Sequence, residues 1–123
     1  VLPADKKYEI NNQVFTKFDR HIVHTKNSLG FRGEEPPGRF HEFLTILTVG
    51  GSTTEDFYLS DGRAWTDHLG EYLQSSFRDL WINNAGLDGH STAGHLILVK
   101  DYVAPMKPDV VIFFKKRPAY NIA

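Results

Sequence analysis

Three short apolar runs, rich in β-branched residues, mark the second half of the chain. They cover residues 43–49, 80–83 and 110–114. Each run is too short for a helix of typical length, and runs of this kind are typical of strands buried in a parallel sheet. The first run ends at Gly50 and Gly51, where the chain is expected to turn.

Two amphipathic stretches separate these runs. The first predicts a helix over residues 64–77, because apolar side chains recur there at helical spacing. Those side chains are Trp65, Leu69, Tyr72, Leu73 and Phe77. The second helix begins after Ser91 or Thr92, either of which can cap it, and stops near Pro105. Its expected apolar face carries Leu96, Val99 and Val103. The order strand, helix, strand, helix, strand specifies βαβ units and therefore an α/β domain with a parallel sheet.

The first part of the chain is dense in turn formers and shows no sustained period. Gly33 and the Glu-Glu-Pro-Pro-Gly segment at 34–38 argue against one long regular element there. We therefore predict an irregular lead-in over residues 1–43, with short strands or a helical turn around Ile22. The α/β domain is predicted to occupy residues 44–123.

Composition places the chain among folded globular proteins and narrows its partners. The 123 residues fit one domain, and 41% of them are hydrophobic. Fourteen basic and fifteen acidic side chains leave a net charge of −1, which gives no electrostatic reason to expect a nucleic acid partner. The apolar runs fall far short of the roughly 20 residues that a membrane span needs. Cysteine is absent, so disulfides and thiolate metal sites are excluded, while the compartment stays open with a slight preference for a secreted or periplasmic one.

Ser52 is the first candidate for chemistry, because it follows the first apolar run on a Gly-Gly-Ser turn. In open α/β sheets, ligands bind beyond the carboxyl ends of the strands, where this turn and the loop at 84–92 are expected to lie. A serine hydroxyl presented there, near backbone N–H groups, suits a nucleophile whose attack creates an oxyanion. The same turn also occurs as a plain glycine turn with a serine cap, so the assignment needs a second feature.

That second feature is a resemblance to the SGNH (GDSL-type) serine hydrolases. Residues 50–52 resemble the first sequence block of the family, 84–92 the second block, and 107–112 the approach to the third strand. The segment Asn-Ser-Leu-Gly-Phe-Arg-Gly at 27–33 is similar to a lead-in found before the first block in a subgroup of the family. The resemblance covers about residues 27–114.

This resemblance implies a flavodoxin-like three-layer α/β/α fold and ester hydrolysis through an acyl-enzyme. Ser52 matches the nucleophile, and its own amide and that of Gly89 match two donors of the oxyanion hole. Gly51 stands where the Gly-Asp-Ser form of the family has aspartate. Asn84 opens the second block and is expected to order its loop. His90 is expected either to contact substrate from that loop or to face solvent.

The remaining catalytic groups of the family do not appear in the sequence. A Gly-x-Asn segment should follow residue 114, and an Asp-x-x-His should supply the general base, but the chain contains neither. A serine hydroxyl is a poor nucleophile without a base. We therefore expect the SGNH fold to be incomplete here, with a second polypeptide or a further C-terminal segment supplying the base and covering an exposed sheet edge. His68 and His95 are weaker substitutes because they fall on predicted helices.

The sequence thus favours a serine-dependent esterase or lipase-like hydrolase whose partner is a small-molecule ester or thioester. One alternative is a non-catalytic module, or an inactive fragment, that binds an acyl or acetylated carbohydrate ligand in the same pocket. A phosphate or nucleotide binder is less favoured, because residues 50–52 match neither phosphate-binding glycine motif. No metal or other cofactor is predicted, since the histidines lack metal-ligand spacing.

Trp65 and Trp81 are expected to be core anchors, and Glu55 is expected to favour the start of a helix after Ser52.

Overall fold

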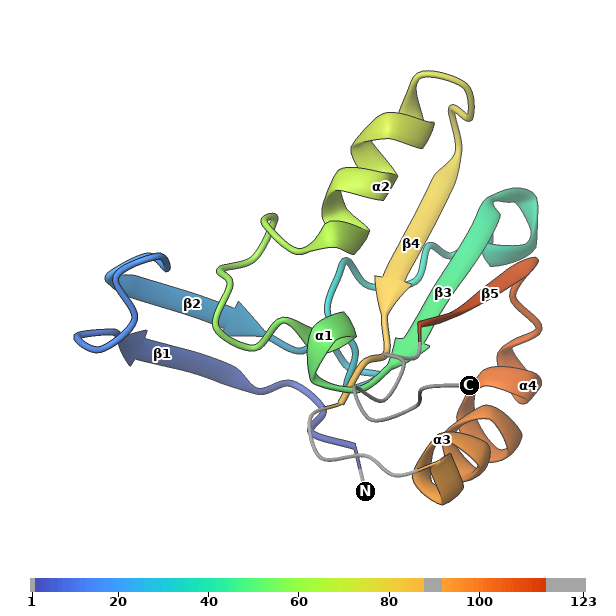
Figure 1. Cartoon of the computed structure of the whole chain (residues 1–123). Helices are drawn as coiled ribbons and strands as arrows, with labels where there is room; N and C mark the ends of the chain where they lie inside the picture. Colours follow the sequence, from blue (N-terminus) through green and yellow to red (C-terminus); the bar gives the residue numbers. More distant parts are fainter. Residues whose placement is uncertain (1, 88–91, 115–123) are drawn as a thin grey trace, which may run out of the picture.

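A three-stranded parallel sheet forms the centre of the computed structural model, which describes residues 2–87 and 92–114. The middle strand is β3 (Leu44–Gly50), flanked by β4 (Leu80–Asn84) on one side and β5 (Val110–Phe114) on the other (Figure 1). The apolar runs predicted all three strands, and their parallel pairing confirms the α/β class.

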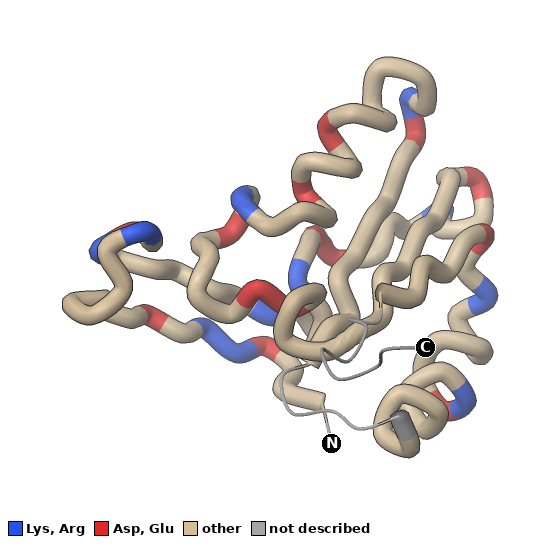
Figure 2. Tube along the Cα trace, viewed as in Figure 1, with Lys and Arg blue, Asp and Glu red and all other residues tan. Residues whose placement is uncertain are grey.

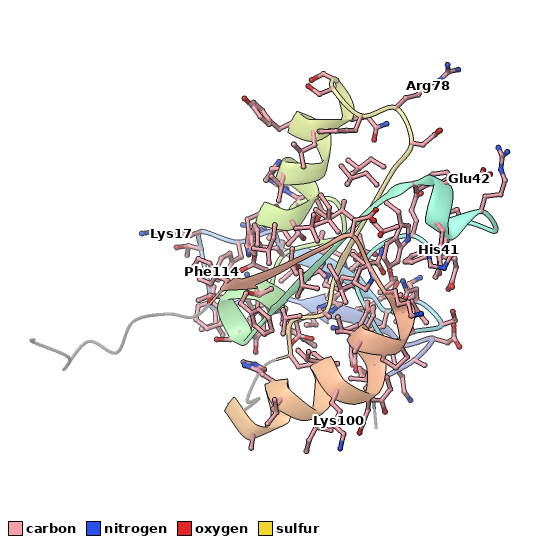
Figure 3. The ribbon with its side chains drawn as sticks, turned by 90° about the vertical axis from the view of Figure 1, so that its right-hand side faces the viewer. Lys17, His41, Glu42, Arg78, Lys100 and Phe114 are labelled. Atoms are coloured by element: carbon pink, nitrogen blue, oxygen red, sulfur yellow. The ribbon has the colours of Figure 1, made fainter. Side chains whose placement is uncertain are left out.

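The carboxyl ends of the three strands meet at one edge of the sheet. In the two registers, Thr48 lies opposite Asn84 and Gly50 lies opposite Phe114. Figure 3 shows Phe114 at this edge, on the side away from His41, which lies just before β3. Loops that follow β3 and β4 therefore begin close together.

Helices cover both faces of the sheet, on opposite sides of the strands in Figure 3. On one face lies α2 (Trp65–Gln74), whose Gly70 packs so closely that an added Cβ would lie 2.9 Å from a methyl carbon of Ile82. The other face is covered by a continuous helical stretch, whose parts are α3 (Thr92–Leu98), the π-helix η2 (Val99–Val103) and α4 (Ala104–Met106). Both predicted helices are confirmed, and the first ends three residues earlier than expected.

The buried face of the second helix agrees with the prediction only in part. Val103, predicted on this face, is 2% exposed and belongs to the core, and Val99 is half-buried. Leu96, also predicted there, is 70% exposed, and Leu98 is buried in its place at 2% exposed. In a π-helix, hydrogen bonds join residues five apart, so side chains at this spacing fall near one face. Pro105 lacks the N–H that a regular α-helix would use there, which gives a physical reason for the wider turn before it.

Part of the segment predicted as an irregular lead-in is regular. β1 (Lys7–Asn11) and β2 (His21–Thr25) form an antiparallel hairpin that projects from the rest of the fold beside α1 in Figure 1. Ile22, expected near a short strand or helical turn, is fully buried in β2. A 3-10 helix, η1 (Phe40–Glu42), leads into β3.

The core lies between the sheet and the helical stretch that contains Leu98. Phe31, from the segment before β3, belongs to this core and is 1% exposed. Trp81 of β4 belongs to it as well, and its ring centre lies 5.2 Å from that of Phe40. Trp81 is thus a core anchor as predicted. Trp65 is only half-buried, and its Nε1 donates to the carbonyl oxygen of Thr53 at 3.2 Å.

Charged residues avoid the central strands and lie mainly on the hairpin, the connecting segments and the helices, with both signs interleaved (Figure 2). β5 is an edge strand with exposed apolar side chains, and no strand among residues 2–87 and 92–114 pairs with its outer side. Those side chains are Val110, Phe113 and Phe114. No helix in these same residues has the length and apolarity to cross a membrane.

Candidate functional site

Ser52 lies at the carboxyl edge of the sheet, where it begins the one-turn helix α1 (Ser52–Glu55) directly after β3. The amides of Thr54 and Glu55 both donate to the carbonyl oxygen of Gly51 at 3.0 Å, which closes the turn. Ser52 is exposed while Thr54 and Glu55 are buried. The turn therefore fixes its backbone against the domain and presents Ser52 to solvent.

Close backbone packing holds α1 against the loop that follows β4. A Cβ added at Gly86 would lie 2.5 Å from the amide nitrogen of Glu55 and 2.8 Å from the carbonyl carbon of Thr54. A Cβ at Gly50 would overlap the hydroxyl of Thr54. The glycines at these two positions allow an approach that no larger residue permits without a backbone shift.

We expect Gly86→Ala to lower the free energy of unfolding by about 1–3 kcal/mol, because the added methyl group has to displace backbone rather than a flexible side chain. Urea unfolding followed by circular dichroism measures the change. Gly38→Ala is the matched control, since nothing lies within 4 Å of its Cβ position. Equal stabilities of the two variants would show that α1 does not pack as closely as described.

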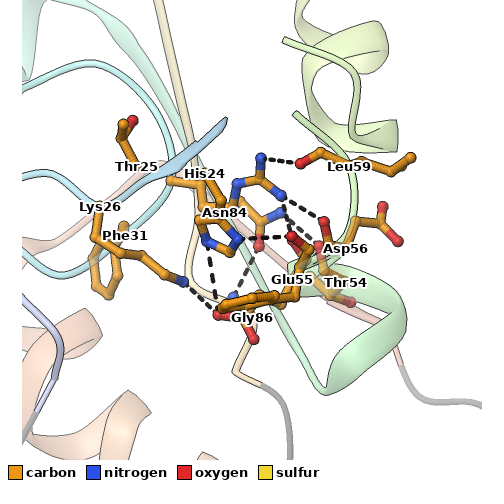
Figure 4. Close-up of polar contacts among 12 residues, drawn as sticks. His24, Thr25, Lys26, Phe31, Thr54, Glu55, Asp56, Leu59, Asn84 and Gly86 are labelled. Carbon is orange, nitrogen blue, oxygen red and sulfur yellow. Dashed lines mark hydrogen bonds and ion pairs between the residues drawn. The ribbon is translucent and has the colours of Figure 1, made fainter. Parts of the chain in front are cut away.

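Asn84 ties α1, α2 and the second loop together from the end of β4. Its side chain is 1% exposed and donates to the carbonyl oxygen of Thr54 at 2.5 Å and to Thr66 Oγ1 at 3.3 Å. Its Oδ1 accepts from the amide of Gly86 at 2.9 Å (Figure 4). Its own backbone pairs in both directions with Arg32, at 2.9 and 2.8 Å. These are the contacts of a residue that orders a loop.

Arg32 binds the carbonyl groups at the end of α1. Its guanidinium donates to the carbonyl oxygens of Glu55, Asp56 and Leu59, each at 2.7 Å, and to Asp61 Oδ1 at 3.2 Å. The last carbonyls of a helix have no partner within the helix, and here the guanidinium of Arg32, which is only 5% exposed, supplies their donors. The lead-in segment thus supplies the cap of the helix that carries Ser52.

A buried ion pair supports the same turn from the hairpin side. Lys26 Nζ lies 2.6 Å from Glu55 Oε2, and the two side chains are 1% and 5% exposed. The carboxylate of Glu55 therefore stabilises the turn through a buried ion pair with Lys26. The sequence predicted only that its charge would favour the start of a helix. Burial lowers the pKa of Lys26, and the hydrogen bond to Glu55 opposes that shift. Sequence analysis missed Lys26 because an isolated lysine in a polar segment usually lies at the surface.

His24 completes this cluster in its neutral form. Its Nδ1 lies 3.1 Å from the carbonyl oxygen of Phe57, which can only accept, so Nδ1 carries the proton. Its Nε2 lies 4.0 Å from Glu55 Oε2. Burial lowers the pKa of His24 to about 4; the positive charges of Arg32 and Lys26 lower it further, while the bond to Phe57 and the charge of Glu55 oppose them.

We expect His24 to make the fold less stable as the pH falls from about 6.5 to 4. In this interval the unfolded state binds a proton that the folded state does not bind, so the loss reaches about 3 kcal/mol near pH 4 and levels off below it. Urea unfolding at pH 7, 5 and 4 measures it. His24→Asn should flatten this dependence, whereas the exposed His41→Asn should leave it unchanged. An unchanged slope in His24→Asn would remove His24 as its source.

Two of the predicted site residues, Gly89 and His90, lie outside the described residues. The two histidines on the helices are not among the described residues that line the surface beside Ser52. His68 is exposed on α2, with its Nδ1 3.9 Å from Glu71 Oε2, and His95 is half-buried on α3. A shallow hollow of about 220 Å³ borders Ser52, and none of the described residues that line it is a histidine.

A metal site does not emerge from this arrangement. In the part of the chain that the structure describes, no three His, Asp or Glu side chains gather as metal ligands would. Asp56, which lines the hollow beside Ser52, has its pKa raised by burial, against the lowering effect of a hydrogen bond from the Trp65 amide. Among the described residues, the exposed Ser52 and the carboxyl group of Asp56 thus line the same hollow.

Comparisons with known protein families, with curated proteins and with solved structures find no match to this chain.

Proposed function

We propose that this chain forms the nucleophile-bearing part of a serine-dependent ester hydrolase of the SGNH type. The observation that carries the proposal is the placement of Ser52, exposed at the carboxyl edge of the middle strand on a turn that buried polar groups hold. Numbered in chain order, the parallel strands lie in the order 2-1-3, as at the start of a flavodoxin-like sheet. Ligands of such sheets bind at this edge.

In the proposed reaction, Ser52 Oγ forms a bond to the carbonyl carbon of an ester and loses its proton to a base. The alcohol leaves with that proton, and water then cleaves the acyl-enzyme to the acid and free serine. The amides of Ser52 and Gly89 are the proposed donors to the oxyanion. The base is assigned to a second polypeptide or a further segment of the chain, as the resemblance implies.

The residues beneath Ser52 have a positioning role in this mechanism. Arg32 caps the carbonyl end of α1, Asn84 binds the carbonyl oxygen of Thr54, and Lys26 pairs with Glu55. All of these partners belong to the turn that begins at Ser52. A nucleophile held on a rigid turn needs no reordering before attack, which is one source of rate enhancement.

Hydrolysis of p-nitrophenyl acetate by the natural protein and by its serine variants tests the proposal. Ser52→Ala should lower kcat at least about a thousandfold, because the nucleophile is gone. Ser76→Ala, an exposed serine after α2, should leave kcat and KM unchanged. Full activity of the Ser52→Ala protein would overturn the assignment.

A non-catalytic module that binds an acyl or acetylated carbohydrate ligand is the second candidate. It is favoured by one observation, which is that no histidine is among the described residues around the hollow beside Ser52. Binding of an ester that is never cleaved by the natural protein would select this candidate over the hydrolase.

A further inference from the structure

An apolar hollow of about 220 Å³ lies beside Ser52, and most of its wall is aromatic or aliphatic. Phe18 comes from the hairpin loop, and Phe57, Tyr58 and Leu59 follow α1. We infer that this hollow binds the acyl group of the substrate, and this inference rests on the hydrolase proposed above. The substrate is then an ester of a short, uncharged acyl group.

Exposed aromatic side chains gather at this place from two distant parts of the chain. Phe15 lies 5.8 Å from Phe18 and 5.7 Å from Tyr58 between ring centres, and Tyr58 lies 5.5 Å from Phe57. Phe15, Phe18 and Tyr58 remain 50%, 40% and 45% exposed. A contiguous apolar surface of this kind marks a binding site more often than a plain surface.

The loop that carries Phe18 is held in place before any ligand binds. Asn12 donates to the carbonyl oxygens of Phe15 and Asp19 and accepts from the amide of Phe15 at 2.9 Å. Arg63 reaches across from the segment before α2 and contacts both carboxylate oxygens of Asp19, at 2.8 and 2.7 Å. The wall of the hollow is thus preformed.

The hollow suits the acyl group rather than the leaving group, because Ser52 itself forms part of its wall. The acyl group stays bonded to Ser52 Oγ through both half-reactions, whereas the alcohol departs after the first. Drug-sized ligands occupy sites of roughly 300–1,000 Å³, so the smaller hollow fits a short acyl group. A larger hollow of about 600 Å³ within the hairpin loop shares Phe18 with it but does not include Ser52.

Binding of methyl butyrate to the Ser52→Ala protein tests this inference without any turnover. Nuclear magnetic resonance spectra should show shifts at the amides of Thr53, Phe57 and Leu59. Phe18→Ala on this background should raise the Kd at least about tenfold, since it removes one apolar wall. Tyr72→Ala, an exposed aromatic residue on α2, is the matched control and should leave the Kd unchanged. The same spectra report whether each variant is folded.

The outcomes separate this inference from the hydrolase proposal. Shifts that saturate with methyl butyrate, but not with methyl glucoside, support a short acyl ligand; binding of the sugar alone overturns it. Absence of shifts around the hollow, in a protein that cleaves esters through Ser52, rejects the hollow and leaves the hydrolase. Binding without any Ser52-dependent cleavage by the natural protein rejects the hydrolase and leaves only a binding site for acyl esters.

Discussion

Lys26→Met is expected to lower the free energy of unfolding by about 3–5 kcal/mol, a large part of the stability of a small domain. The variant removes the ammonium group 2.6 Å from Glu55 and leaves the carboxylate in a site where its side chain is only 5% exposed. A buried charge that loses its partner keeps its full desolvation cost, which makes removal of one partner far more damaging than removal of both. Chemical denaturation at pH 7 measures the loss.

The double variant Lys26→Met with Glu55→Met should regain most of that stability, because neither charge then remains buried. Lys7→Met is the matched control: Lys7 pairs with Glu9 at 3.3 Å, but both side chains are more than half exposed. Such surface pairs contribute about 0–1 kcal/mol. A Lys26→Met protein as stable as the Lys7→Met protein would contradict the buried pair.

Arg32→Ala is expected to lower the free energy of unfolding by at least about 3 kcal/mol, because it removes a buried guanidinium that donates to three carbonyl groups at once. These groups belong to Glu55, Asp56 and Leu59. Arg32→Lys should recover little of the loss, since an ammonium group cannot reproduce the planar set of donors. The same denaturation measurement applies to both variants.

The guanidinium of Arg63 offers a control at an exposed site. It binds Asp19 through both carboxylate oxygens but is 61% exposed, so Arg63→Ala should cost less than about 1 kcal/mol. If Arg32 acts as a positioning residue, ester hydrolysis by Arg32→Lys should lose kcat with little change in KM, while Arg63→Lys keeps kcat. A rise in KM with unchanged kcat would indicate that Arg32 serves substrate binding instead.

The central sheet could be predicted from sequence because its strands are determined by local composition. The runs that became β3, β4 and β5 are short, apolar and flanked by polar or glycine residues, so no partner had to be known to identify them. The helical spacing that gave α2 is equally local. The placement of Ser52 followed from the same reasoning, because the end of β3 sets it.

Features that depend on distant partners could not be predicted. The hairpin of β1 and β2 is closed by a long loop rather than a two-residue turn, so its sequence carries little turn signal. In the second helix, the π-helical turn places Leu98 in the core instead of the predicted Leu96, while Val103 is buried as predicted. A period of 3.6 residues cannot anticipate such a change.

The contacts that hold the turn of Ser52 could not be predicted for the same reason. Lys26 and Glu55 are 29 residues apart, and Arg32 reaches carbonyl groups 23 to 27 residues further along the chain. A single basic residue in a polar segment does not reveal which backbone groups it will bind. Only the fold brings the lead-in, the end of β4 and α1 together.

Covalent labelling of Ser52 by a fluorophosphonate, followed by intact-mass spectrometry, tests the central claim most directly. The natural protein, treated with the probe, should gain the mass of one adduct, and peptide mapping should place it on Ser52. The Ser52→Ala protein should gain no mass, and the Ser76→Ala protein should label as the natural one does. A natural protein that gains no adduct, or gains one at another residue, would contradict Ser52 as an activated nucleophile.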